Sequence, residues 1–131
     1  MNKRIVSTAA VFGLIAVILG AFGAHTLKER IGTAELATWA KGVEYQFYHV
    51  FALLFLAASG KLHSKFVGYA YWFFTIGIIF FSGSLYLLST REISHIESLN
   101  FIGPITPVGG LLFILGWIML LVAALKQDDA R

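Results

Sequence analysis

The chain has 131 residues, of which 58% are hydrophobic and only 13% are charged. Soluble domains carry about 45–50% apolar and about 25% charged residues, so this composition excludes an ordinary soluble domain and indicates lipid as the surrounding solvent. The absence of cysteine excludes disulfides and cysteine-ligated iron–sulfur clusters, and the net charge of +3 lies in short segments between apolar runs, so we expect no nucleic-acid partner.

Four apolar runs predict transmembrane helices, because about 20 apolar residues are needed to cross the hydrocarbon core of a bilayer. The runs cover approximately residues 5–24, 44–60, 66–88 and 107–125. The first run follows Lys3 and Arg4, as in a signal peptide, but it exceeds the roughly 7–15 apolar residues of a signal sequence, which favours a retained helix. We therefore predict one all-α domain over residues 1–131, a polytopic up-down bundle of four transmembrane helices.

The first run carries a stripe of small residues at helical spacing. Its members are Ala9, Gly13, Ala16, Gly20 and Ala24. In lipid, small residues allow helix backbones to approach closely, so we predict that this stripe packs the bundle. Gly109 and Gly116, one heptad apart in the fourth run, predict a second close contact. A homo-oligomer formed through the same faces is the competing use.

The connection between the first two runs is amphipathic. Leu36, Trp39, Ala40 and Val43 fall on one helical face, with Thr33 as a candidate N-cap after Gly32. We predict an interfacial segment over residues 33–41 that bends near Gly42 into the second span.

The distribution of lysine and arginine predicts the orientation. With four spans, one side carries six basic residues, namely Lys3, Arg4, Lys61, Lys65, Lys126 and Arg131. The other side carries four, namely Lys28, Arg30, Lys41 and Arg91. The positive-inside rule therefore favours a cytoplasmic location for both termini.

Strongly polar side chains collect at the extracytoplasmic end of the predicted bundle. Since such groups are costly in a membrane, we treat them as one candidate ligand-binding cluster. Its members are His25, Glu44, Tyr45, Gln46, Tyr48, His49, Ser82, Tyr86 and Thr106. Helical spacing places Tyr45, Tyr48 and His49 on one face, and Ser82 and Tyr86 on another. We expect these two faces to converge, with His25 at the rim.

Three interpretations of this cluster remain open. The polar groups satisfy one another and brace the bundle; they hold a lipid headgroup, a quinone or a small metabolite; or His25, His49 and Glu44 bind zinc or copper, or act as acid–base groups. No HExxH or comparable spacing supports a metal site, so we predict no cofactor. A bis-histidine haem is the weakest interpretation, because His25 lies close to the surface.

Several motifs resemble a known family. They read GAFGAH over residues 20–25, GVEYQFYH over 42–49, FSGSLY over 81–86, TPVGG over 106–110 and GW at 116–117. Together they resemble the domain of unknown function 423 family, also called uncharacterised protein family 0382, small bacterial inner-membrane proteins related to the eukaryotic transmembrane protein 256. The resemblance implies four spans and a bacterial plasma-membrane location, and it implies no particular activity. The residues that match its motif positions are His25, Tyr45, Gln46, His49, Ser82, Gly83, Tyr86, Thr106, Pro107 and Trp117.

We therefore favour a non-enzymatic protein that binds a lipid or a small amphipathic ligand through the polar cluster, or that serves as a membrane scaffold. A small-solute or ion transporter is the alternative. Against it, the cytoplasmic half shows no polar pathway and no pair of interrupted helices is evident. A metal-dependent membrane enzyme ranks third. Membrane lipids are the expected partners.

Overall fold

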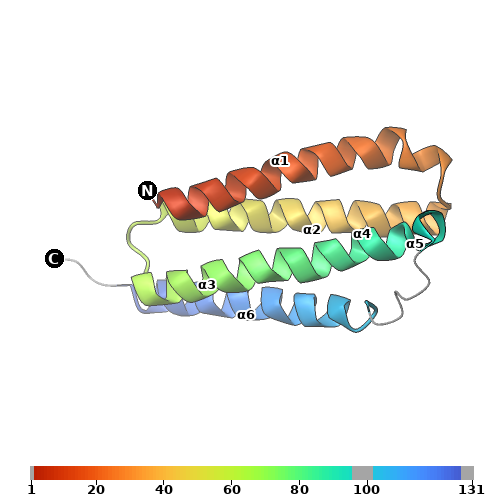
Figure 1. Ribbon diagram of the computed structural model, residues 1–131. Helices are drawn as coiled ribbons and strands as arrows, with labels where there is room; N and C mark the ends of the chain where they lie inside the picture. The colour runs from red at the N-terminus through yellow and green to blue at the C-terminus, as the bar shows by residue number, and fades with distance from the viewer. Residues whose placement is uncertain (1, 96–101, 128–131) are drawn as a thin grey trace.

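The computed structural model describes residues 2–95 and 102–127, and the regular structure in these two stretches is helical (Figure 1), which confirms the all-α prediction. In chain order the elements are α1 (Lys3–His25), the 3-10 turn η1 (Leu27–Glu29), α2 (Thr33–Ala58), α3 (Ser64–Gly77), the π-helical segment η2 (Ile78–Ser82), α4 (Gly83–Ser89), α5 (Arg91–Ser94) and α6 (Ile105–Leu125). The elements α3, η2 and α4 form one continuous rod, which runs alongside α1, α2 and α6.

The bundle has two distinct ends. Helix α1 begins and α6 ends at the same end, together with the turn between α2 and α3 (Figure 1), and we call this the terminal end. The opposite end holds η1, the start of α2, α5 and the start of α6, and we call it the distal end.

The small-residue stripe of α1 packs against α2. Ala9 and Ala16 are fully buried, and a Cβ atom added to Gly13 or Gly20 would lie 3.5 or 3.4 Å from the nearest valine side chain of α2. Near the distal end, the indole Nε1 of Trp39 donates to the Leu19 carbonyl at 2.9 Å. The stripe predicted from spacing therefore packs α1 against α2 of the same chain, although its last member, Ala24, is exposed.

Helix α2 runs without interruption through Gly42, where the sequence predicted a bend. A Cβ atom at Gly42 would lie 2.8 Å from the Tyr86 ring, so the glycine permits close approach of α4 to α2. Thr33 is the first helical residue and Gly32 occupies the N-cap position, one residue before the predicted cap. The segment over residues 33–41 is thus the first part of α2.

Helix α6 packs against the α3–η2–α4 rod through the two predicted glycines. A Cβ atom at Gly109 would lie 2.7 Å from the Cα of Phe81, and one at Gly116 would lie 2.6 Å from the Phe74 ring. Because Phe81 lies in η2, the π-helical segment meets α6 backbone to backbone. The helix begins at Ile105 after Pro104, two residues before the apolar run over 107–125 that predicted the fourth span.

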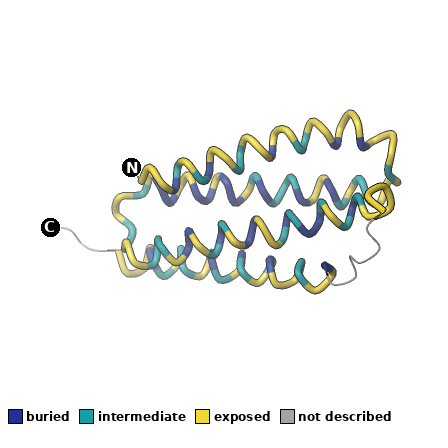
Figure 2. The backbone as a smooth tube through the Cα atoms, viewed as in Figure 1, coloured by how far each residue is buried: buried dark blue, intermediate teal, exposed yellow. Residues whose placement is uncertain are grey.

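The outward faces of the rods are apolar. Figure 2 shows buried positions turned between the rods and exposed positions turned outward. Large side chains such as Leu14, Phe51, Leu111 and Leu121 are exposed by more than half, a pattern unusual for the surface of a soluble protein. Three stretches of the described chain are long and apolar enough to cross a membrane. They are Lys3–Glu29, Ser64–Ser89 and Ile105–Leu125.

Candidate functional site

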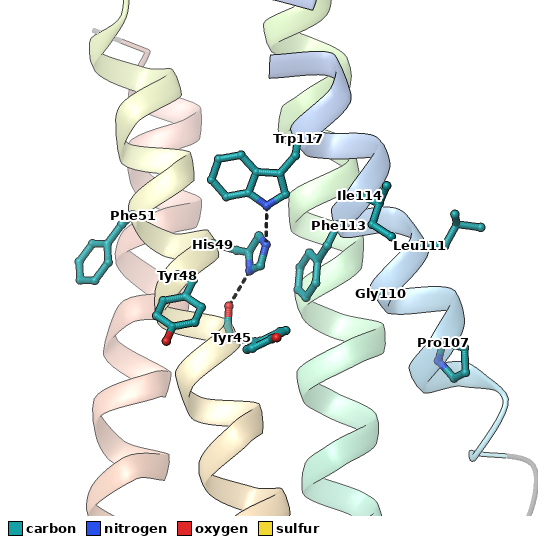
Figure 3. A pocket seen from close by; sticks show the side chains of 10 residues that line it. All are labelled: Tyr45, Tyr48, His49, Phe51, Pro107, Gly110, Leu111, Phe113, Ile114 and Trp117. Carbon is teal, nitrogen blue, oxygen red and sulfur yellow. Dashed lines mark hydrogen bonds between the residues drawn. The ribbon is translucent and has the colours of Figure 1, made fainter. Parts of the chain in front are cut away.

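An open groove lies on the side of the bundle between α2 and α6. Its volume is about 900 Å³, and the buried ring of His49 is part of its lining (Figure 3). Helix α2 contributes Tyr45, Tyr48, His49 and Phe51; α6 contributes Pro107, Gly110, Leu111, Phe113, Ile114 and Trp117. Pro107 lies in the first turn of α6, so the groove extends from near the distal end toward the middle of the bundle.

Hydrogen bonds fix the tautomer of His49. The indole Nε1–H of Trp117 donates to His49 Nε2 at 3.1 Å. An indole nitrogen only donates, so Nε2 carries no proton, and Nδ1 carries the proton that it donates to the Tyr45 carbonyl at 2.7 Å (Figure 3). The ring is therefore neutral in this arrangement, and both of its nitrogens are engaged.

Aromatic rings hold His49 in place. Its ring stacks on Phe113 with centroids 3.5 Å apart and planes within 5°. Phe74 and the edge of Trp117 lie 5.4 and 5.9 Å away, and only 4% of His49 is exposed. The imidazole is thus a fixed part of the groove wall, joining α2 to α6 and α3.

A polar pair, Lys41 and Glu44, lies next to two residues that line the groove, Tyr45 and Tyr48, and we call this side the rim. The Tyr48 hydroxyl donates to the Glu44 carboxylate, which also pairs with Lys41 at 3.3 Å. Tyr48 is half exposed, so this cluster meets the surroundings at the distal side of the groove. Tyr45 stacks on Phe81 at 4.9 Å and separates the rim from the bundle interior. Glu44 and Lys41 do not line the groove itself, but each contacts a residue that does, Glu44 through the Tyr48 hydroxyl and Lys41 through the Tyr45 ring, whose centre lies 5.9 Å from Lys41 Nζ.

A second polar arrangement lies inside the bundle, and we call it the Gln46 lock. The Gln46 amide NH₂ donates to the Phe12 carbonyl of α1 at 2.7 Å, and its Oε1 accepts from the Tyr86 hydroxyl of α4 at 2.7 Å. Ser82 also donates to the Gly42 carbonyl at 2.7 Å. Gln46 is 2% exposed, and Ser82 is fully buried. These bonds join α1, α2 and the η2–α4 stretch with little space left for a ligand.

A third contact joins α4 to α6. The hydroxyls of Ser84 and Thr106 lie 2.6 Å apart, and Ser84 also donates to the Phe81 carbonyl at 2.8 Å. Because Ser84 is buried, this pair closes the bundle near the start of α6.

The structure divides the predicted cluster instead of gathering it. Gln46, Ser82 and Tyr86 belong to the Gln46 lock, whereas Tyr45, Tyr48 and His49 line the groove. His49 faces α6 and Phe74, not Ser82 and Tyr86. His25 is exposed at the end of α1, and Glu44 lies at the groove rim. Thr106 bonds to Ser84. Among the described residues, no three His, Cys, Asp or Glu side chains come together as metal ligands.

Sequence reasoning did not assign the α6 half of the groove. Phe113 and Trp117 make the principal contacts of His49, yet an aromatic residue in an apolar helix resembles any other lipid-facing or core residue. One signal was available. The indole of Trp117 needs an acceptor if it is buried in lipid, and His49 is a polar group that needs a partner.

Comparison with known proteins identifies close relatives over almost the whole chain. The family described as "Protein of unknown function (DUF423)" matches residues 19–110. A UPF0382 membrane protein of Staphylococcus aureus is 44% identical over 124 residues, covering 95% of this chain and 97% of its own. The UPF0382 membrane protein YwdK of Bacillus subtilis is 43% identical over 126 residues, covering 95% of this chain and 98% of its own.

A relative from a Gram-negative bacterium carries a more specific name. The UPF0382 inner membrane protein YgdD of Escherichia coli K12 is 40% identical over 121 residues, covering 90% of this chain and 86% of its own. No solved structure shows significant similarity to the chain.

Proposed function

We propose, since the chain belongs to the DUF423 (UPF0382) family of membrane proteins, that it crosses the bacterial plasma membrane four times and binds a lipid or other small amphipathic molecule in the groove between α2 and α6. The open groove beside His49 is the observation that carries this proposal. The family and the apolar outer surface supply the membrane setting.

The way in which the loops connect the helices supports a fourth span. Helix α1 ends at the distal end, and α3 begins at the terminal end (Figure 1). If α1 and the α3–α4 rod both cross the bilayer, α2 must return across it. Its 26 residues extend for about 39 Å at about 1.5 Å per residue. The polar Gln46 and His49 are turned inward and hydrogen-bonded, which removes much of their cost in lipid.

The proposed orientation places the terminal end in the cytoplasm. That end carries Lys3, Arg4, Lys61, Lys65 and Lys126, while the basic residues of the distal end are accompanied by glutamates. The positive-inside rule then directs the groove rim toward the extracytoplasmic leaflet.

The groove fits an amphipathic ligand better than a polar solute. Its walls are rings and aliphatic side chains, which suit an acyl chain or another apolar tail. At the rim, Glu44 and Lys41 offer an anion and a cation side by side, which suits the ammonium and phosphate of a zwitterionic headgroup. Phosphatidylethanolamine is therefore the probe of choice.

Filling the groove tests the proposal. Gly110 lines the groove, and a Cβ atom there has its nearest neighbour, the Phe81 ring, at 3.8 Å, so the site has room for the first atom of a side chain and we expect Gly110→Leu to extend into the groove. We expect native mass spectrometry of gently extracted wild-type protein, titrated with phosphatidylethanolamine, to show a bound lipid that Gly110→Leu loses.

The matched control is Gly83→Leu, where an added Cβ atom meets nothing within 4 Å and the groove is untouched. It should retain the lipid. Equal occupancy in both variants, or no bound lipid in the wild type, would refute the groove as a binding site.

A further inference from the structure

The terminal end of the bundle has a second cavity, which we call the Arg4 pocket. It encloses about 340 Å³ between the start of α1, the last turn of α2 and the first two turns of α3. Its polar and aromatic lining comes from Asn2, Arg4, Ser59, Ser64, Tyr71 and Trp72. It lies at the opposite end of the bundle from the groove rim.

Two aromatic rings hold the Arg4 guanidinium. Its central carbon lies 4.8 Å from the centre of the Trp72 ring and 5.3 Å from that of Tyr71. The Tyr71 hydroxyl is fixed by Thr8 at 2.8 Å, and Thr8 in turn donates to the Arg4 carbonyl at 3.0 Å. Stacking on ring faces leaves the N–H edges of a guanidinium available, and these edges match the oxygens of a phosphate group.

The described residues around Arg4 include no acidic side chain. Within residues 2–95 and 102–127, the acidic side chains belong to η1, the first half of α2 and α5, all at the distal end. None of them lies within ion-pair distance of Arg4, since the ion pair found in this part of the chain joins Lys41 to Glu44. The pocket lining includes no carboxylate to receive an ammonium group, whereas Ser59 and Ser64 can donate to an anion.

The remaining lining is apolar. Ile5, Leu56 and Val67 form the side of the pocket that faces the bundle. Trp72 beside it is half exposed, which suits an aromatic side chain at a membrane interface. This combination of a stacked arginine, hydroxyl donors and an apolar wall suits a phosphate that carries acyl chains.

We propose that the Arg4 pocket binds the phosphodiester of an anionic phospholipid, such as phosphatidylglycerol. This site does not depend on the α2–α6 groove. An anionic headgroup is preferred over a zwitterionic one because the pocket lining includes no carboxylate to pair with an ammonium, and Arg4 already occupies the faces of its aromatic rings.

The test is a titration of the detergent-extracted protein with phosphatidylglycerol or phosphatidylcholine of the same acyl chains, read by native mass spectrometry. We expect the wild type to bind phosphatidylglycerol more tightly. Arg4→Gln should weaken this binding on the order of tenfold, as for one lost charge-assisted contact, and should remove the preference between the two lipids. Arg4→Lys should be intermediate, because it keeps the charge but loses the planar fork.

Lys126→Gln is the matched control. It removes one positive charge from the same end, yet Lys126 stacks on Phe66 and does not line the pocket. Equal weakening by Arg4→Gln and Lys126→Gln would show general attraction to the basic end and would overturn the proposal, as would unchanged binding in Arg4→Gln.

Two further outcomes complete the experiment. Millimolar inorganic phosphate should not displace the lipid; if it competes fully, the pocket binds a free anion and the lipid assignment fails. If Arg4→Gln does not fold, Trp72→Leu removes the exposed stacking surface instead, and it should lower phosphatidylglycerol binding while leaving phosphatidylcholine binding unchanged. Unchanged binding of both lipids would contradict the proposal.

Discussion

Gln46 and His49 lie three residues apart on α2, and both are buried, yet they have different surroundings. Gln46 is enclosed by α1 and α4, and hydrogen bonds satisfy its amide on both sides. His49 is equally well bonded, but the wall to which it belongs borders an open groove. A buried polar residue in a membrane helix therefore indicates a partner, whereas a binding site also requires space beside it.

The largest expected change in the free energy of unfolding is at Gly109 of α6. Gly109 packs inside the bundle and its neighbour Gly110 lines the groove, so the pair repeats the contrast between Gln46 and His49. A Cβ atom at Gly109 would meet the backbone of Phe81, whereas one at Gly110, which lines the groove, would have its nearest neighbour at 3.8 Å. We expect Gly109→Ala to lower the free energy of unfolding by about 3 kcal/mol, because the backbone of η2 must move. Gly110→Ala should be neutral or slightly stabilising, since alanine favours helix by up to about 1 kcal/mol.

Unfolding in mixed detergent micelles measures both variants. Similar stability of the two would mean that α6 does not pack against η2 as described.

The next largest change in the free energy of unfolding is expected on breaking the Gln46 lock. Gln46→Leu keeps a similar volume but removes the bonds to Phe12 and Tyr86, so we expect a loss of about 2 kcal/mol, with the Tyr86 hydroxyl left unpaired. Tyr86→Phe removes one bond of the pair and should cost about 1 kcal/mol. The same unfolding assay separates these values. A Gln46→Leu protein as stable as the wild type would show that the lock is dispensable.

The smallest effect concerns the bond between His49 and Trp117. In the wild type we expect ¹⁵N NMR of labelled histidine to show Nδ1 protonated and Nε2 unprotonated, as the indole donor requires. Trp117→Phe removes that donor, so the spectrum should shift toward a mixture of tautomers, with a stability loss of about 1 kcal/mol. Trp72→Phe, far from His49, should leave its signals unchanged. A wild-type ring protonated at Nε2 would contradict the assigned bond.

The sequence predicted the helical rods and their close contacts well, because both depend on local patterns. Apolar runs of sufficient length defined the helices, and the spacing of Ala9, Gly13, Ala16 and Gly20 identified the face of α1 that packs on α2. Continuity of α2 through Gly42 was missed, because a glycine that permits close packing and one that ends a helix look alike in sequence.

The arrangement of the polar side chains was predicted less well, for two physical reasons. In a regular α-helix, the spacing of Ile79, Ser82 and Tyr86 would place all three on one face. The π-helical segment η2 has more residues per turn than an α-helix, so it changes the direction in which successive side chains point around the helix axis. As a result, Ser82 is buried, whereas Ile79 is half exposed. On α2, the inward face is centred between Gln46 and His49, which leaves Tyr48 outside.

His25 was expected at the rim of the cluster, but it lies outside. Helix α1 packs mainly along α2, and the chain leaves it at Thr26 to bury Leu27 in η1. The apolar side chain thus occupies the inward position at this corner, and the histidine two residues earlier is turned away from the bundle. Sequence alone gives the depth of such residues but not which of them the connecting turn directs inward.

The central claim is that the Gln46 lock stabilises the bundle while the groove holds a ligand. The most direct measurement is phosphatidylethanolamine occupancy by native mass spectrometry in Gln46→Leu and Gly110→Leu, at a temperature where both proteins are folded. The account predicts wild-type occupancy in Gln46→Leu and loss of the lipid in Gly110→Leu. The reverse result, with occupancy lost on breaking the Gln46 lock and retained on filling the groove, would contradict it.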